Sequence, residues 1–155
     1  MYIFDSNSFN EMSKIYPSRF PSFWTKIDEY IKNGSIISVK EAYEEVTRGA
    51  DQDDFLDWVK NNKAIFLAPS QQETFFVVEI FETKNFRDMV RKKQLFEGKP
   101  VADPFLIASA KVREGIVVTE ERYRKNSAKI PTICEHFGIK TLNLEGFMTQ
   151  ENWLF

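Results

Sequence analysis

The stretch MYIFDSNSF, residues 1–9, sets the organisation of the whole chain. Its apolar run at 2–4 predicts a short buried strand, and Asp5 follows this strand without a spacer. The polar residues at 6–7 then predict an immediate turn. An Asx turn onto the backbone of Asn7 would account for Asp5 without any chemistry. Because Asp5 comes directly after a buried strand, we instead expect a functional carboxylate whose partners come from later in the chain.

Short apolar strands alternate with helical patterns over the rest of the sequence. Further strands are predicted at 35–38, 116–119 and 139–143, with 64–68 as a strand or an extended link. Helices are predicted at 8–16, 20–34, 38–46, 53–61, 71–96 (with a break near 85), 103–115 and 131–137. This alternation is typical of an α/β fold with a mostly parallel sheet covered on both faces. Ligands of such sheets bind beyond the carboxyl ends of the strands, which is where Asp5 is expected.

Length and composition favour one globular domain over residues 1–155. Hydrophobic residues make up 43% of the chain, which is enough for a packed core. The net charge of −2 argues against a protein that coats nucleic acid non-specifically. No apolar run reaches the roughly 18 residues of a membrane span, and the N-terminus lacks the pattern of a signal peptide. We therefore expect a cytoplasmic protein without membrane contact.

The sequence lacks the motifs of several other enzyme classes. It contains no phosphate-binding G-x-x-x-x-G-K-[ST], no dinucleotide-binding G-x-G-x-x-G and no G-x-S-x-G nucleophile elbow. The single cysteine, Cys134, lies in an apolar helical pattern, so we expect a core residue in a reducing compartment. The single histidine, His136, lies near a predicted helix end without a second histidine or cysteine nearby. A zinc site is therefore not expected.

Some of the polar residues at predicted helix starts have a structural explanation as caps. Ser8 with Glu11, and Ser38 with Glu41, fit the S-x-x-E capping box. Asp103 precedes a proline, which fits an N-cap with proline at the first helical position. We therefore predict a capping role for Glu41 and leave Asp103 open between a cap and a functional acid.

Acidic residues gather where the predicted strands end. Glu44 and Glu45 lie on the helix after the second strand and both flank its apolar stripe, so which of them faces the sheet edge stays open. Glu120 and Glu121 follow the strand at 116–119, with first-turn acids of a helix as the alternative interpretation. Four carboxylates at one edge would repel each other unless a cation joined them. Mg²⁺ and Mn²⁺ prefer such oxygen ligands, and this kind of site suits phosphodiester chemistry.

Four segments together resemble, in order, the motifs of PIN-domain ribonucleases, a family that includes VapC-type toxins. They are YIFDSN, IISVKEAYEEV, ADPFLIASA and IVVTEE. YPSRFPSFW and KIPTICEHFGI further resemble a bacterial PIN-like group. The resemblance covers nearly the whole chain and implies a PIN-like three-layer α/β/α sandwich with a central, mostly parallel sheet. It also implies Mg²⁺- or Mn²⁺-dependent endonucleolytic cleavage of single-stranded RNA, leaving a 5′-phosphate and a 3′-hydroxyl.

The resemblance assigns roles to individual residues of this chain. It implies four catalytic acids, which are Asp5, Glu45, Asp103 and Glu121, and of these Asp5, Asp103 and Glu121 match the metal ligands. Supporting roles at the metal site fall to Asn7, Thr119, Glu44 and Glu120. The fourth acid of the family is usually Asp. The extra methylene of Glu121 shifts its carboxylate, so this residue acts directly on the metal, through water, or not at all.

Two basic segments are candidates for contact with the RNA backbone. One is KNFRDMVRKK at 84–93, for which a solvated helix face is an equal alternative. The other directly follows the fourth motif and contains Arg122, Arg124 and Lys125, with Tyr123 placed to stack on a base. For this second segment we favour substrate contact because it adjoins the predicted site.

The middle of the chain carries many aromatic residues. They are Phe75, Phe76, Phe81, Phe86 and Phe96. We expect them in the core, with a groove for a partner or a homodimer face as the alternative. Many members of the resembled family are toxins of toxin–antitoxin pairs, which implies a small antitoxin protein as a partner.

Two other functions compete with the ribonuclease hypothesis. The first is a catalytically silent PIN-like module that binds RNA or protein, in which Glu121 would reflect lost chemistry. The second is a metal-dependent phosphatase on a similar sheet. The phosphatase hypothesis lacks support because Asn7 replaces the second acid of the D-x-D pattern expected after the first strand.

Overall fold

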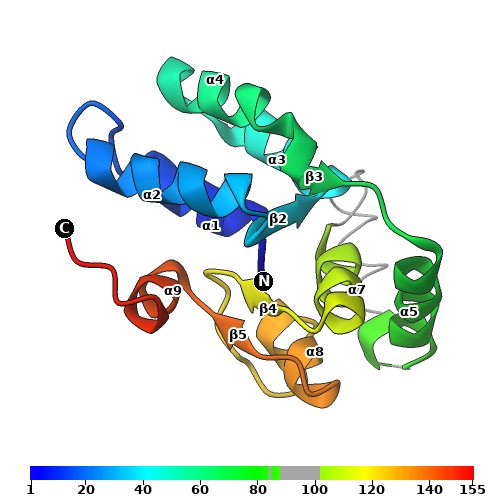
Figure 1. The fold of residues 1–155 in the computed structure, drawn as a ribbon. Helices are drawn as coiled ribbons and strands as arrows, with labels where there is room; N and C mark the ends of the chain where they lie inside the picture. Colours follow the sequence, from blue (N-terminus) through cyan, green and yellow to red (C-terminus); the bar gives the residue numbers. More distant parts are fainter. Residues whose placement is uncertain (84, 88–101) are drawn as a thin grey trace.

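A five-stranded, all-parallel sheet forms the centre of the computed structural model, which describes residues 1–83, 85–87 and 102–155. The strand order is β3-β2-β1-β4-β5 (Figure 1). The strands are β1 (Tyr2–Phe4), β2 (Ile36–Val39), β3 (Phe66–Leu67), β4 (Ile116–Val118) and β5 (Thr141–Leu142). The predicted α/β class and parallel sheet are confirmed.

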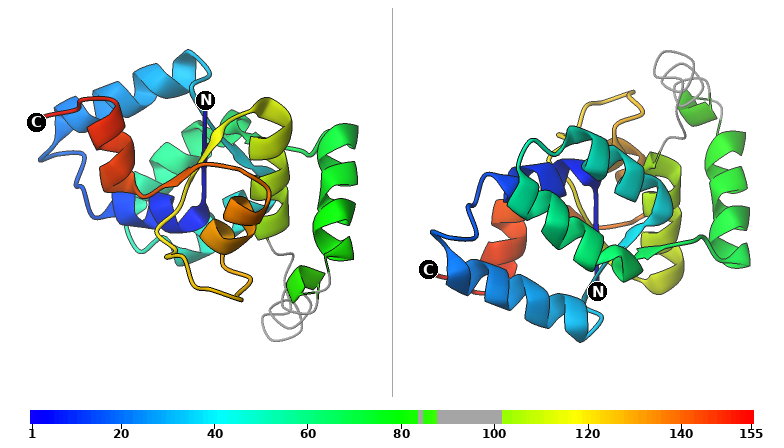
Figure 2. Two further views of the ribbon diagram at one scale, coloured as in Figure 1. Left: turned by 90° about the horizontal axis from the view of Figure 1, so that it is seen from below. Right: turned by 90° about the horizontal axis from the view of Figure 1, so that it is seen from above.

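Helices cover both faces of this sheet. Figures 1 and 2 show three helices on one side, α1 (Ser6–Ser13), α2 (Pro21–Lys32) and α9 (Leu144–Gln150). On the other side lie α7 (Asp103–Arg113) and, outside it, α5 (Gln71–Glu82). The remaining helices are α3 (Lys40–Gly49), α4 (Asp53–Asn61), the 3-10 turn η1 (Lys63–Ile65) and α8 (Ile130–His136). None of the helices described is long and apolar enough to span a membrane.

The strand β1 lies in the middle of the sheet because its residues are apolar on both faces. Ile3 pairs in register with Ile37 of β2 on one side and with Val117 of β4 on the other. All three residues are buried, as expected for a parallel strand that is covered by helices on both faces. Central placement brings the end of β1, and therefore Asp5, between the ends of two neighbouring strands.

The helix caps differ from those that the sequence predicts. The box of Ser8 and Glu11 is wrong, because α1 already begins at Ser6 and Asp5 is its N-cap residue. The box of Ser38 and Glu41 is also wrong. Strand β2 continues through residue 39, so Ser38 still belongs to the sheet, and its hydroxyl donates to the carbonyl oxygen of Phe4 at 2.7 Å.

Of the two alternatives left open for Asp103, the N-cap is wrong as well. Ala102 occupies the N-cap position of α7, and Asp103 is the first residue of the helix. A capping box does occur at the start of α5, where Ser70 and Glu73 exchange side-chain and backbone hydrogen bonds. Asp103 is 6% exposed, so it lies at a buried helix start without serving as the cap.

Most of the expected core residues of the middle and C-terminal regions are buried. Cys134 is fully buried, and burial raises the pKa of its thiol to about 12, which fits a packing role. Phe76 and Phe86 belong to the core, whereas Phe75 is 64% exposed, so the core prediction is wrong for Phe75. Phe81 is half-buried against the core. Phe96 and most of the basic segment 84–93 lie outside the described residues.

The close approach between β1 and β4 gives a test of the packing. Gly115 precedes β4, and a Cβ atom there would overlap Ile3 Cδ1 and lie 3.1 Å from the carbonyl oxygen of Met1. We expect Gly115→Ala to lower the free energy of unfolding by about 1–3 kcal/mol, since overpacking forces the strand to shift. Urea denaturation followed by circular dichroism measures this change.

The matched control is Gly49→Ala at the end of α3. A Cβ atom there would lie 3.8 Å from the Asn10 side chain, an ordinary contact. This variant should be as stable as the parent or slightly more stable. Equal stability of Gly115→Ala and Gly49→Ala would contradict the packing described for β1 and β4.

Candidate functional site

Asp5 is the centre of the candidate site. It is 1% exposed and stands at the carboxyl end of β1, where its backbone N–H donates to the carbonyl oxygen of Val118 at 2.9 Å. Its own carbonyl oxygen accepts the N–H groups of Ser8 and Phe9, which starts α1. The backbone of Asp5 is therefore held by the sheet on one side and by a helix on the other.

Three side chains hold the carboxylate of Asp5. Thr119 Oγ1 donates to Oδ2 at 2.9 Å, and Asn7 Nδ2 donates to the same oxygen at 3.2 Å. Ser6 Oγ donates to Oδ1 at 3.3 Å. The predicted supporting residues Asn7 and Thr119 thus contact Asp5, so the Asx-turn alternative is not needed to explain its position.

Burial raises the pKa of Asp5 to about 7. Desolvation is the largest cause, followed by the negative charge of Asp103. The hydrogen bond from Thr119 lowers the pKa, and the charges of Glu121 and Glu45 raise it further. Three predicted acids from the other three motifs therefore lie close enough to Asp5 to affect its charge.

Glu45 reaches the site through a serine. Ser6 Oγ donates to Glu45 Oε2 at 2.6 Å and lies 3.3 Å from Asp5 Oδ1, so the hydroxyl bridges the two carboxylates. Glu44 instead forms an exposed ion pair with Arg48 at 3.1 Å. Of the two adjacent glutamates, Glu45 faces the site and Glu44 faces solvent.

Glu121 lies at the edge of the site and binds the next helix. Its backbone N–H donates to Thr119 Oγ1 at 3.2 Å, so the hydroxyl of Thr119 links Glu121 to Asp5. Its carboxylate accepts the N–H of Ile130 at 2.8 Å through Oε2 and lies 3.5 Å from Lys129 Nζ through Oε1. Because these contacts anchor α8, direct metal ligation by Glu121 would compete with its role as a helix anchor.

Glu120 anchors another helix. Glu120 Oε1 accepts the N–H of Leu144, the first residue of α9, at 2.8 Å and the hydroxyl of Ser8 at 3.3 Å. The alternative interpretation, that Glu120 and Glu121 are first-turn acids of a helix, is therefore wrong. They lie in the segment between β4 and α8, and each carboxylate receives the first N–H of a different helix.

One polar residue that sequence reasoning did not assign to the site also belongs here. Ser6 bridges Asp5 and Glu45, and its position inside the first motif was the only signal available. Glu41 lies one turn before Glu45, where residues four apart share a helix face. Among the described residues, no partner hydrogen-bonds to its buried Oε2 atom, and the predicted capping role of Glu41 is wrong, since α3 has no side-chain cap.

The carboxylate oxygens of the site are ligands that suit a hard divalent cation. Aspartate and glutamate oxygens are the ligands that Mg²⁺ and Mn²⁺ prefer. Over residues 1–83, 85–87 and 102–155, no three acidic, histidine or cysteine side chains converge into a ready-made metal cage. Mg²⁺ typically keeps several waters and binds through one or two carboxylates, so Asp5 with Asp103 suffices in number.

The predicted substrate-binding residues lie beside these acids. Arg122, Tyr123, Arg124 and Lys125 are all exposed and occupy the segment between β4 and α8. The Arg124 backbone is tied to α8, since its N–H donates to Thr132 Oγ1 and its carbonyl oxygen accepts the Thr132 hydroxyl. Of the segment 84–93, only residues 85–87 are described, with Arg87 exposed.

Comparisons with known proteins place the chain by sequence and by fold. The sequence profile of the family described as "Domain of unknown function (DUF4411)" matches residues 2–155. The crystal structure of FitAcB from Neisseria gonorrhoeae is similar, with a TM-score of 0.50, 12% identity, and coverage of 92% of this chain and 97% of that chain. The crystal structure of PAE2754 from Pyrobaculum aerophilum is also similar, with a TM-score of 0.50 and 11% identity. The match covers 96% of this chain and 94% of that chain. No functionally curated protein matches. At these identities the likeness shows the fold alone, a PIN-like α/β/α sandwich.

The raised pKa of Asp5 predicts how stability depends on pH. Between about pH 4, the unfolded pKa, and about pH 7, the folded protein holds a proton on Asp5 that the unfolded chain releases. The contribution of this group to stability therefore falls as pH rises. In chelator, Asp5→Asn should be more stable than the parent at pH 8, by on the order of a few kcal/mol, and similar to it at pH 4.5.

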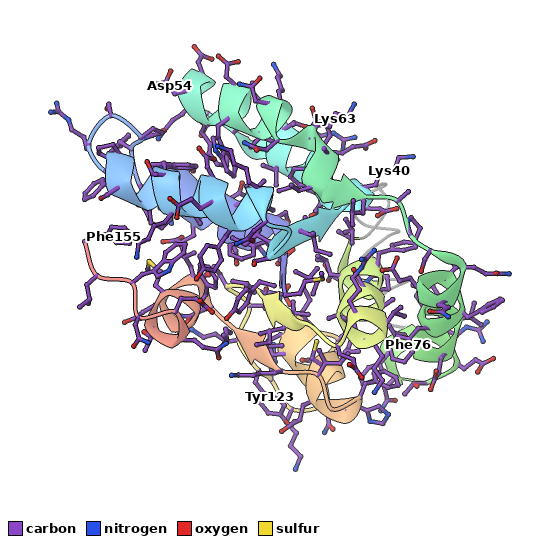
Figure 3. The ribbon with its side chains drawn as sticks, in the orientation of Figure 1. Lys40, Asp54, Lys63, Phe76, Tyr123 and Phe155 are labelled. Atoms are coloured by element: carbon purple, nitrogen blue, oxygen red, sulfur yellow. The ribbon has the colours of Figure 1, made fainter. Side chains whose placement is uncertain are left out.

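Urea denaturation of both proteins at several pH values measures this difference. Asp54→Asn is the matched control, since Asp54 is exposed at the far end of α4 (Figure 3). It should follow the pH dependence of the parent. A gap between Asp5→Asn and the parent that stays constant from pH 4.5 to pH 8 would show that Asp5 is not held as described.

Proposed function

The chain belongs to the DUF4411 family and has a PIN-like fold, and on these premises we propose that it is a divalent-metal-dependent endoribonuclease. Its substrate would be single-stranded RNA, and the reaction hydrolysis of a phosphodiester bond. The observation that carries this proposal is the buried Asp5 carboxylate, whose pKa is raised to about 7 by desolvation and by the charge of Asp103. Such a group is costly to the fold unless a cation or a proton compensates it.

The roles of the residues follow from their contacts. Asp5 and Asp103 would hold Mg²⁺ or Mn²⁺, which polarises a phosphodiester and lowers the pKa of an attacking water. Thr119 and Asn7 fix the Oδ2 atom of Asp5, so its carboxylate keeps one orientation. The hydroxyl of Ser6 links Glu45 to Asp5, and Glu45 would serve as a second base for the attacking water.

Glu121 would complete the acidic pocket without binding the cation directly. Its charge acts on Asp5, while its oxygens are held by the start of α8 and by Lys129. This arrangement suits the interpretation that the longer glutamate acts through water. The exposed Arg122, Arg124 and Lys125 next to it would offset the repulsion between the acids and the RNA backbone.

A toxin of a toxin–antitoxin pair is the finer form of this proposal. It is supported by the resemblance of the four motifs to a family in which many members are such toxins. The partner would then be a small antitoxin protein that blocks the RNA site. Cleavage by the chain alone, suppressed by the product of a neighbouring gene, is the behaviour that this proposal requires.

A catalytically silent RNA- or protein-binding module is the second candidate function. The observation that favours it is the carboxylate of Glu121, where each oxygen already faces a helix N–H or a lysine. A silent module would bind without metal-dependent cleavage. The two functions therefore separate in a direct assay of RNA cutting.

We expect the chain to cut a fluorescent single-stranded RNA in Mg²⁺ or Mn²⁺ and not in chelator. Asp103→Asn and Glu45→Gln should each lower the cleavage rate by at least about 100-fold, the contribution typical of a positioned acid or base. The matched controls are Asp54→Asn and Glu44→Gln, which remove the same charge from exposed positions. Gel analysis of the products against time measures the rates.

The outcomes separate the candidates. Full activity in the two controls, with loss in the two site variants, supports the nuclease and its site together. Equal loss in Glu44→Gln and Glu45→Gln would show that net charge, and not the site, controls the rate. RNA binding without cutting across several RNAs and both metals would favour the silent module.

A further inference from the structure

A pocket opens directly beside the candidate site, at the carboxyl ends of β4 and β5. Its volume is about 340 Å³, within the range of small-ligand pockets. Thr119 and Glu121 line it on the side of Asp5, and Thr141, Leu142 and Asn143 line the opposite side. Thr119 thus lines the pocket and also hydrogen-bonds to Asp5, so it lies between the pocket and the acidic centre.

One wall of the pocket is formed by an exposed aromatic ring. Tyr123 is 54% exposed, so the ring is accessible, and the carboxylate of Glu135 on α8 lies near enough to raise the pKa of its hydroxyl. Figure 3 shows Tyr123 at the edge of the molecule next to β5 and α8. Pro131 and Leu142 add apolar surface beside it. A flat, accessible ring next to apolar walls suits a planar aromatic ligand.

The two acids of the pocket are already compensated. Glu120 accepts the N–H of Leu144, and Glu121 accepts the N–H of Ile130 and faces Lys129. Helix N-termini stabilise negative charge, so these carboxylates repel an incoming phosphate less than free ones would. Arg122, which also lines the pocket, supplies a positive charge for the backbone of a nucleic acid.

Asn143 gives the pocket a defined hydrogen-bonding character. Its Oδ1 atom accepts the N–H of Gly146 at 2.8 Å as the N-cap of α9. The amide oxygen is therefore used by the helix, and the NH₂ group, which only donates, remains for a ligand of this exposed side chain. The pocket would favour a group that presents an acceptor at its edge, such as a base carbonyl or ring nitrogen.

We infer that this pocket binds one unpaired nucleobase of the RNA, stacked on Tyr123 with an acceptor of its edge facing the amide of Asn143. The inference rests on the proposed function and names a subsite of it. Because the pocket adjoins the acids, the bound base belongs to a nucleotide next to the phosphate that is cut. Base recognition at single-stranded positions commonly works in this way. Cleavage would then prefer particular bases at one fixed position.

Binding tests the subsite without relying on catalysis. The probe is a short single-stranded RNA that carries 2-aminopurine at one position, whose fluorescence falls on stacking, bound to the Asp103→Asn variant in Mg²⁺. We expect Tyr123→Ala, added to this variant, to weaken binding about 5- to 150-fold, the equivalent of one stacked base. It should also abolish the fall in fluorescence.

Three further variants make the result specific. Tyr123→Phe keeps the ring and should retain the fluorescence change. Asn143→Asp removes the donor and should reduce binding of the 2-aminopurine RNA. Tyr16→Ala is the matched control, since Tyr16 is 53% exposed and does not line the pocket. It should bind like its parent.

The outcomes for the subsite and for the nuclease differ. Loss of stacking in Tyr123→Ala alone supports the subsite, even if the parent cuts no RNA and the proposed function fails. Unchanged stacking in Tyr123→Ala, or equal loss in Tyr16→Ala, would overturn the subsite while leaving a cutting enzyme intact. The absence of any RNA binding would overturn both.

Discussion

The candidate site is organised around a carboxylate that is buried at the end of the central strand. Asp5 can occupy this position because β1 pairs with β2 and β4 on its two sides and is covered by helices on both faces. The cost of the buried charge appears in its raised pKa. Ser6, Asn7 and Thr119 hydrogen-bond to its carboxylate, whereas the charges of Asp103, Glu121 and Glu45 raise its pKa, which is the arrangement that the proposed divalent cation would compensate.

The acidic edge also holds the helices of the C-terminal half. Glu120 receives the first N–H of α9 and Glu121 receives the first N–H of α8. Thr119 joins this framework to Asp5 through one hydroxyl, which donates to the carboxylate and accepts from Glu121. The site, the pocket at Tyr123 and the packing of two helices are therefore coupled through three consecutive residues, so changes at 119–121 affect stability as well as chemistry.

The sequence was sufficient for the fold class, because it follows from local patterns, and the same patterns pointed to Glu45, Asp103 and Glu121, whose charges act on Asp5 in the structure. Buried strands read as continuous apolar runs, and α4 has the bounds 53–61 that its periodicity predicts. The capping box predicted at Ser38 was wrong because Ser38 still belongs to β2. The length of this strand is decided by its pairing with neighbouring strands, which the local pattern does not contain. The choice between Glu44 and Glu45 needed the position of Ser6, on another helix, which no periodicity contains. The helix contacts of Glu120 and Glu121 join residues that only the tertiary fold brings together.

The central claim is that the proton on Asp5 stands where a metal ion binds. Calorimetric titration with Mn²⁺ at pH 6, in two buffers of different ionisation enthalpy, measures binding and proton release together. Since the pKa of Asp5 is about 7, the parent should bind Mn²⁺ and release about one proton at pH 6 and far less at pH 8. Asp5→Asn should bind weakly and release none. Tight binding by the parent without proton release, or binding that Asp5→Asn leaves unchanged, would contradict the account.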